Sequence, residues 1–173
     1  MARLAMLWLL AGALLAAQRP SRPPDIYFAT TRQAVADAML ALAGATRADV
    51  VVDLGSGDGR IPILAAQKYG ARGVGVEIDQ ALVLLSCQNA TEGGVADRVS
   101  IIEGDLFQAD LSTATVVTLY LSESINLDLE PKLRRELKPG ARIVSHQFSM
   151  GRWQADQVVR AVDGTDLFLW TIR

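Results

Sequence analysis

The sequence is poor in the residues that form covalent cross-links and metal sites. Among its 173 residues there is one cysteine, Cys87, and one histidine, His146. A single cysteine cannot form a disulfide within the chain, and neither residue type is numerous enough to supply the ligands of a cysteine- or histidine-based metal site. We therefore predict no metal. We expect Cys87 to be a small core residue on a helix and His146 to be a hydrogen-bonded core residue rather than a base.

An excess of positive charge is also missing. The chain carries 17 Lys and Arg against 19 Asp and Glu, a formal net charge of −2, and it contains no basic run. Proteins that hold nucleic acid through its phosphates display clustered Lys and Arg. The composition therefore argues against a nucleic-acid partner.

Long hydrophobic runs are absent except near the amino terminus, where residues 4–17 are almost all apolar. This run is shorter than the roughly 18–20 residues that cross a bilayer comfortably, and it has the length of a signal-peptide core. The Pro- and Arg-rich stretch that follows is typical of a linker. We divide the chain into a hydrophobic segment over 1–17 (an anchor or a signal peptide), a linker over 18–24 and one domain over 25–173. Arginines flank the segment on both sides, so the charge does not favour carrying the domain across the membrane. We expect an uncleaved membrane anchor with the domain facing the cytoplasm; export after signal cleavage is the alternative.

Strand and helix patterns alternate throughout the domain. We predict helices over 30–43, 60–69, 81–91 and 127–137, strands over 50–54, 73–77, 99–103, 114–121 and 141–148, and a final hairpin of strands 158–162 and 167–172. Such alternation indicates an α/β fold with a doubly wound, mostly parallel sheet that is covered on both faces.

The most informative stretch joins the strand 50–54 to the helix that begins at residue 60. Three glycines at alternate positions let a ligand lie against the main chain at the start of a helix. A dinucleotide loop has the different spacing G-x-G-x-x-G, and two carboxylates here would repel its diphosphate. We therefore predict a ligand with a positive end and no phosphate, such as S-adenosylmethionine. The residues predicted to hold it are Asp53, Gly55, Ser56, Gly57, Asp58 and Gly59.

Two further acids end the next two strands. Glu77 closes the second strand, where a carboxylate can accept both hydroxyls of a ribose. Asp105 follows the third strand, where it can accept from the exocyclic amine of an adenine, and the apolar Leu106 and Phe107 can pack on the ring. Each feature is weak alone, but the three in this order favour an adenosyl ligand.

These motifs resemble the class I S-adenosylmethionine-dependent methyltransferases. The resemblance rests on D-L-G-S-G-D-G-R over 53–60, V-G-V-E over 74–77 and G-D-L-F over 104–107. It implies a Rossmann-like sheet of seven strands that ends in the antiparallel hairpin.

The stretch Tyr27-Phe28-Ala29-Thr30 is similar to the start of two groups of small lysine methyltransferases: the mitochondrial ATP synthase c-subunit enzymes and the non-SET histone lysine methyltransferases. That similarity implies that Tyr27 and Thr30 lie over the cofactor. A helix N-cap is the alternative for Thr30.

The acceptor pocket of a doubly wound fold lies beyond the carboxyl ends of the strands. At the end of strand 114–121 we expect Tyr120 beside the cofactor and on the substrate side, with Glu123 attracting an incoming ammonium. Trp153 is a candidate cap of the pocket, and packing of its loop onto the sheet is the alternative. We assign no base, because methyl transfer depends mainly on alignment and the exclusion of water.

We predict a methyltransferase that acts on a protein lysine, and a small-molecule methyltransferase is the alternative within that class. From other classes, the chain could be an NAD-dependent oxidoreductase or a non-catalytic cofactor-binding protein. The first of these would need the third glycine one position later. The sequence does not indicate an oligomeric state.

Overall fold

A computed structural model describes residues 29–173 of the protein. The predicted hydrophobic segment 1–17, the linker 18–24 and Tyr27 lie outside the described residues. Over residues 29–173, none of the helices combines the length and the apolar character needed to cross a bilayer.

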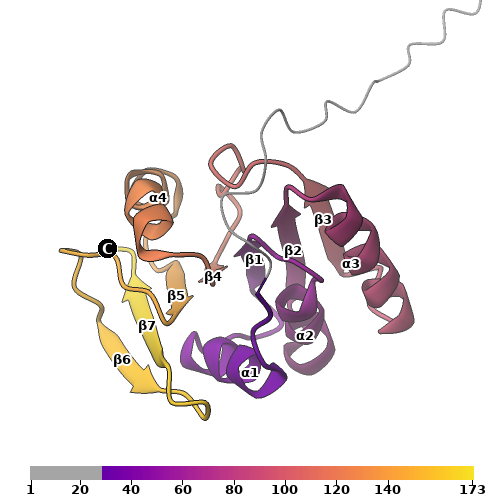
Figure 1. Cartoon of the computed structure of the whole chain (residues 1–173), viewed down its shortest axis with the longest axis horizontal. Helices are drawn as coiled ribbons and strands as arrows, with labels where there is room; N and C mark the ends of the chain where they lie inside the picture. Colours follow the sequence, from indigo (N-terminus) through magenta and orange to yellow (C-terminus); the bar gives the residue numbers. More distant parts are fainter. Residues whose placement is uncertain (1–28) are drawn as a thin grey trace, which may run out of the picture.

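Seven strands and four helices make up the described part of the chain (Figure 1). The strands are β1 (Val50–Leu54), β2 (Arg72–Glu77), β3 (Val99–Glu103), β4 (Val116–Leu119), β5 (Arg142–His146), β6 (Gln157–Arg160) and β7 (Asp166–Thr171). The helices are α1 (Gln33–Leu42), α2 (Arg60–Tyr69), α3 (Gln80–Glu92) and α4 (Glu123–Glu136).

All seven strands form one sheet in the order β3-β2-β1-β4-β5-β7-β6. Strands β1 to β5 pair in parallel, and β7 runs antiparallel to both β5 and β6. The predicted doubly wound sheet with an antiparallel hairpin is therefore confirmed. The direction of strand order reverses between β1 and β4, and ligands bind at the carboxyl edge of such a switch point.

Helices cover both faces of the sheet (Figure 1). Alternate residues of a strand point to opposite faces. Val51 of β1 shares a hydrophobic cluster with Val35 of α1 and Ile61 of α2. Leu54 of the same strand belongs instead to the cluster that contains Leu129 of α4. Helices α1 and α2 therefore cover one face, together with α3 near β3, and α4 covers the other.

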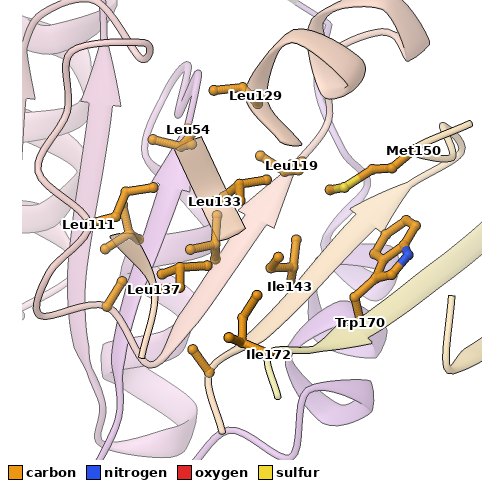
Figure 2. Packing of buried hydrophobic residues seen from close by; sticks show 14 of the residues in the cluster. Leu54, Leu111, Leu119, Leu129, Leu133, Leu137, Ile143, Met150, Trp170 and Ile172 are labelled. Carbon is orange, nitrogen blue, oxygen red and sulfur yellow. The ribbon is translucent and has the colours of Figure 1, made fainter. Parts of the chain in front are cut away.

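The cluster under α4 joins residues that are far apart in the sequence. Figure 2 shows side chains of β1, β4 and β5 meeting those of α4, β7 and the loop that contains Met150. Trp170 of β7 is 1% exposed, and its Nε1–H donates to the Trp153 carbonyl at 2.9 Å. Since that polar atom has its partner, the large ring is buried without a desolvation penalty.

Several boundaries differ from those predicted. Helix α1 begins at Gln33 with Arg32 at its N-cap, so the N-cap alternative for Thr30 is wrong. Helix α4 begins at Glu123, four residues early, because Ser122 caps it by accepting from the Ile125 N–H at 3.3 Å. Strands β4 and β5 are shorter than predicted. β5 ends at His146 because the next residue, Gln147, has φ 68° and leaves strand geometry.

Cys87 lies on α3 as predicted but not in the core. It is an exposed free thiol. The fully buried positions of α3 are Ser86 and Ala90. The expectation of a buried cysteine is wrong, because α3 presents only this narrow stripe to the neighbouring α2 and β3.

Candidate functional site

The loop after β1 turns the chain into α2 through three glycines. Gly55, Gly57 and Gly59 have φ values of 77°, 55° and 78°, which residues with a Cβ rarely adopt. Space is also short at Gly55, where a Cβ would lie 2.8 Å from Leu121 Cδ2. The predicted strand, glycine loop and helix are all present, and the loop touches the segment that follows β4.

Glu77, at the carboxyl end of β2, fixes the glycine loop. Its Oε2 accepts from the Gly57 N–H at 2.8 Å, and its Oε1 accepts from the N–H groups of Ile78 and Asp79 at 2.8 and 2.9 Å. A carboxylate has about four acceptor positions, so one is left, on Oε2. Binding of the ribose hydroxyls by Glu77 stays a prediction.

Asp53 is a buried carboxylate with a hydroxyl as its hydrogen-bond partner. It is 4% exposed, and Thr118 of β4 donates to its Oδ1 at 2.6 Å. Burial raises the pKa of Asp53 to about 7; the Thr118 hydrogen bond opposes this rise, and the negative charges of Glu77 and Asp58 add to it. An acid in this position favours a positive group beside it. The site therefore fits the ammonium and sulfonium of S-adenosylmethionine.

Asp58 is paired rather than open. It receives two hydrogen bonds from the Arg60 guanidinium, from Nε to Oδ1 at 2.9 Å and from Nη2 to Oδ2 at 2.5 Å, and a third from the Arg60 backbone N–H. Arg60 also donates from Nη1 to the Thr31 carbonyl at 2.7 Å, which ties the glycine loop to the segment that contains the exposed Thr30. The repulsion of a diphosphate therefore depends on Asp53 and Glu77 more than on Asp58. Contacts of Asp58, Ser56 and Thr30 with the cofactor stay predictions.

The turn after β3 comes to the same edge. Glu103 pairs with Glu77 in the strand register, and the Gly104 N–H donates to the Glu77 carbonyl at 2.9 Å. Asp105 Oδ1 accepts from the Phe107 N–H at 2.9 Å, which closes the turn. Leu106 and Phe107 are half-buried against the core under α4. The structure thus brings Asp105 and Leu106 close to Glu77, and their contact with an adenine stays a prediction.

Aromatic and acidic side chains gather at the carboxyl ends of β4 and β5. The half-buried Tyr120 stacks on His146 with ring centroids 4.1 Å apart, and on Phe148 with centroids 6.2 Å apart. The exposed Glu123 accepts from the Ser149 hydroxyl at 3.1 Å. Tyr120 and Glu123 therefore belong to one edge, next to the loop residue Leu121 that faces Gly55.

The structure does not bring Trp153 to that edge. Its ring lies 5.9 Å from the Trp170 ring and 3.7 Å from the Arg134 guanidinium of α4. It is half-buried against the core cluster under α4. These contacts match the alternative of simple loop packing rather than a cap over Tyr120.

Sequence reasoning missed two contributors to the site. Thr118 is a hydroxyl residue in an otherwise apolar strand, and that signal could have pointed to a buried partner such as Asp53. Asn126 of α4 is fully buried, and its Nδ2 donates to the Ser145 hydroxyl at 3.0 Å and to the Phe148 carbonyl at 3.1 Å. Nothing in the helical pattern marked Asn126 as inward-facing. Across residues 29–173, no cluster of acidic, histidine or cysteine side chains could hold a metal ion.

Sequence comparison places this site in a known family. The family model of the ANTKMT methyltransferase domain matches residues 53–157. A protein-lysine N-methyltransferase from Saccharolobus islandicus is 42% identical over 142 residues, which cover 82% of this chain and 88% of that protein. The human ATP synthase c-subunit lysine N-methyltransferase is 38% identical over 108 residues, 62% of this chain and 46% of its own length.

Structural comparison agrees. The crystal structure of an RNA methyltransferase from Salinibacter ruber in complex with S-adenosyl-L-homocysteine has 53% sequence identity and a TM-score of 0.81, and the match covers 83% of this chain and 94% of that one. Since all of these matches are methyltransferases, the NAD-dependent and the non-catalytic alternatives are set aside. The chain therefore belongs to the ANTKMT methyltransferase domain family, and it is an S-adenosylmethionine-dependent methyltransferase, as the resemblance implied.

Proposed function

We propose that the enzyme transfers the methyl group to the side-chain amine of a lysine in a protein. The observation that carries this proposal is the make-up of the edge beside the glycine loop, where Tyr120, Phe148 and Glu123 gather. Aromatic faces and a carboxylate attract a cationic side chain such as that of lysine. The names of the Saccharolobus and human relatives, both lysine methyltransferases, support the same acceptor.

The residues at the ends of β1 and β2 would hold the cofactor. S-adenosylmethionine, when bound, supplies a methyl group on a sulfonium centre that an amine can attack. Asp53 would face the positive end of the ligand, since it is buried and its pKa is raised by that burial. The remaining acceptor position of Glu77 would take one ribose hydroxyl. The glycine loop would let the ligand approach the main chain.

The edge of β4 and β5 would prepare the acceptor. Glu123 is exposed, so it can attract an ammonium from solvent. Deeper in, the half-buried rings of Tyr120 and Phe148 would attract the ammonium, and the lysine would release its proton to solvent before the neutral amine attacks the methyl group. Alignment then does the remaining work, and the enzyme needs no side chain to act as a base.

RNA is the second candidate acceptor, because the Salinibacter structure is named as that of an RNA methyltransferase. The net charge of −2 and the carboxylate at the acceptor edge favour a cationic acceptor over a polyanion. A small molecule is the third.

Labelled methyl transfer from S-adenosylmethionine into a cell lysate distinguishes these acceptors. After the reaction, the lysate is divided into protein, RNA and small-molecule fractions, and labelled protein is hydrolysed to amino acids. The proposal expects the label in protein, as methyllysine, and less of it with Asp53→Ala, which should bind the cofactor more weakly. Label in RNA that is lost on ribonuclease treatment, with none in protein, would contradict it.

A further inference from the structure

His146 is buried at the carboxyl end of β5, and the proposed methyl transfer gives it no role. It is 3% exposed, and its Nε2 lies 2.9 Å from Thr165 Oγ1 in the β6–β7 turn. The Thr165 hydroxyl donates to Asp163 Oδ1 at 2.6 Å. Because a hydroxyl has only one hydrogen, Thr165 accepts from His146, and this network assigns the proton to Nε2. The imidazole is thereby held in one tautomer and one orientation.

The ring so fixed supports Tyr120. In the register of β4 and β5, Thr118 pairs with Val144, so Tyr120 and His146 occupy corresponding positions two residues further on. Both side chains therefore point to the face of the sheet that carries α1. Their ring centroids are 4.1 Å apart with an interplanar angle of 28°, which is a stacked arrangement.

A strained turn brings a second ring onto Tyr120. Gln147 has φ 68°, and the Phe148 N–H donates to the His146 carbonyl at 2.8 Å, which makes a γ-turn of the rare, strained kind. Two hydrogen bonds hold the turn. The Gln147 N–H donates to the Asp166 carbonyl at 2.7 Å, and Asn126 Nδ2 donates to the Phe148 carbonyl. Strain of this kind persists only where the surroundings impose it, and it concentrates at functional sites.

His146 supports Tyr120 as a neutral ring. Burial lowers the pKa of His146, and the nearby Asp163 carboxylate opposes that shift only in part. The ring is therefore neutral near pH 7. A positive charge behind Tyr120 would repel an incoming ammonium, whereas a neutral ring leaves the aromatic face attractive to it.

We propose that His146 is a positioning residue for the acceptor: fixed by Thr165 and Asp163, it supports the Tyr120 ring, which together with Phe148 receives the acceptor's cationic side chain. The inference rests on the proposed lysine acceptor. It makes the β6–β7 turn a part of acceptor recognition, although the turn touches no reacting atom.

Four variants of the full chain test this role. His146→Ala removes the ring, His146→Phe keeps a ring without the hydrogen bond, and Thr165→Val removes the hydroxyl that orients the imidazole. Leu167→Ala is the matched control, because Leu167 is buried and pairs with His146 in the β5–β7 ladder but takes no part in the ring stack. With the acceptor found in the lysate, His146→Ala should raise the acceptor KM about tenfold or more, since misplaced contacts of this kind are costly.

The dissociation constant for S-adenosylhomocysteine should change much less than the acceptor KM in all four variants, because the stack includes neither Asp53 nor Glu77. His146→Phe should have an acceptor KM close to the wild-type value. The acceptor KM of Thr165→Val should lie between those of His146→Phe and His146→Ala. An unchanged KM in His146→Ala, or an equal rise in Leu167→Ala, overturns the proposal.

A readout that needs no acceptor separates this proposal from the proposed function. The NMR resonances of the Tyr120 ring, assigned with Tyr120→Phe, should shift in His146→Ala, which loses the neighbouring ring, and should stay near wild type in Leu167→Ala. Unchanged Tyr120 resonances overturn the positioning role. Methyl label in RNA overturns the lysine acceptor and, with it, the cationic side chain assigned to the two rings; the support of Tyr120 by His146 is then decided by the Tyr120 resonances, which should still shift in His146→Ala.

Discussion

The two halves of the carboxyl edge are fixed by different means. At β1 and β2, backbone N–H groups of the glycine loop and of the β2–α3 turn converge on the Glu77 carboxylate. At β4 and β5, side chains do the work, through the stack of Tyr120 with His146 and Phe148 and through the hydrogen bonds of Asn126. The first kind of site tolerates no added side chain, and the second depends on the shape of a few particular ones.

Of the changes considered, Gly73→Ala should have the largest effect on the cofactor half of the edge, at the ends of β1 and β2. A Cβ at Gly73 would lie 2.4 Å from the Pro62 carbonyl oxygen, so α2 would have to move away from β2 and carry the end of the glycine loop with it. We expect the free energy of unfolding to fall by about 3 kcal/mol. Binding of S-adenosylhomocysteine should be lost with it, as measured by urea denaturation and calorimetric titration.

Gly104→Ala is the control for that change. The nearest atom to a Cβ at Gly104 is Ile102 Cγ2 at 4.0 Å, and its φ lies outside the left-handed region. The free energy of unfolding should change by no more than about 0.5 kcal/mol. A similar loss in both variants would show that the close approach of α2 to β2 is not the cause.

Asp53→Asn should weaken cofactor binding without unfolding the protein. The amide keeps the shape and can still accept from Thr118, but it loses the charge that faces the ligand. We expect the binding free energy of S-adenosylhomocysteine to weaken by about 1–3 kcal/mol, so that its dissociation constant rises roughly 5- to 150-fold. The free energy of unfolding at pH 7 should not fall, because a buried carboxylate is itself unfavourable. A large drop in the urea midpoint would contradict this assignment.

The pH dependence of binding should reveal the same carboxyl group. Because burial raises the pKa of Asp53 to about 7, binding of a cation beside it releases a proton below that pH. Affinity should therefore increase with pH, by up to about tenfold per unit below pH 7, and level off above it. Asp53→Asn should abolish the slope in titrations between pH 6 and 8.

The stability of the free protein should follow pH in the opposite sense. The folded pKa of Asp53 is above the unfolded value of 3.8, so between those two values the folded state holds a proton that the unfolded state has lost. The contribution of Asp53 to the free energy of unfolding is thus present below about pH 4 and is lost as pH rises to about 7. Asp53→Asn should lack this part of the pH dependence in urea denaturation.

Glu123→Gln should have the smallest effect, and only on the acceptor half. Glu123 is exposed, so its attraction for an ammonium is worth about 0.5–1 kcal/mol. The acceptor KM should rise roughly two- to fivefold at low salt and less at high salt. Asp97→Asn is the control: it also removes one negative charge, near the amino end of β3, and should leave the acceptor KM unchanged. A change in cofactor affinity in Glu123→Gln would mean that the two halves are not independent.

The same contrast explains what the sequence could predict. The cofactor half was predictable because glycine spacing and strand-end acids report directly on backbone geometry, and the observed loop, strand β1 and helix α2 match the predicted ones. The pairing of Asp58 with Arg60 was not predicted, because a charge in a loop does not show which neighbour it will choose.

The acceptor half was harder for a physical reason. A glutamine carries no signal for positive φ, so the turn at Gln147 and the early end of β5 could not be foreseen. Hydroxyl residues of low helix propensity hid the start of α4. The position of Trp153 depends on contacts with Arg134 and Trp170, which only the folded chain brings together.

The β6–β7 turn is the kind of surface hairpin that protein engineers shorten, stiffen or replace when they want a more soluble or heat-resistant variant. Here Thr165 and Asp163 reach inward from that turn to hold His146. Any redesign of this hairpin should keep those two side chains, since a loop swap that looks harmless on the surface would loosen a ring in the interior.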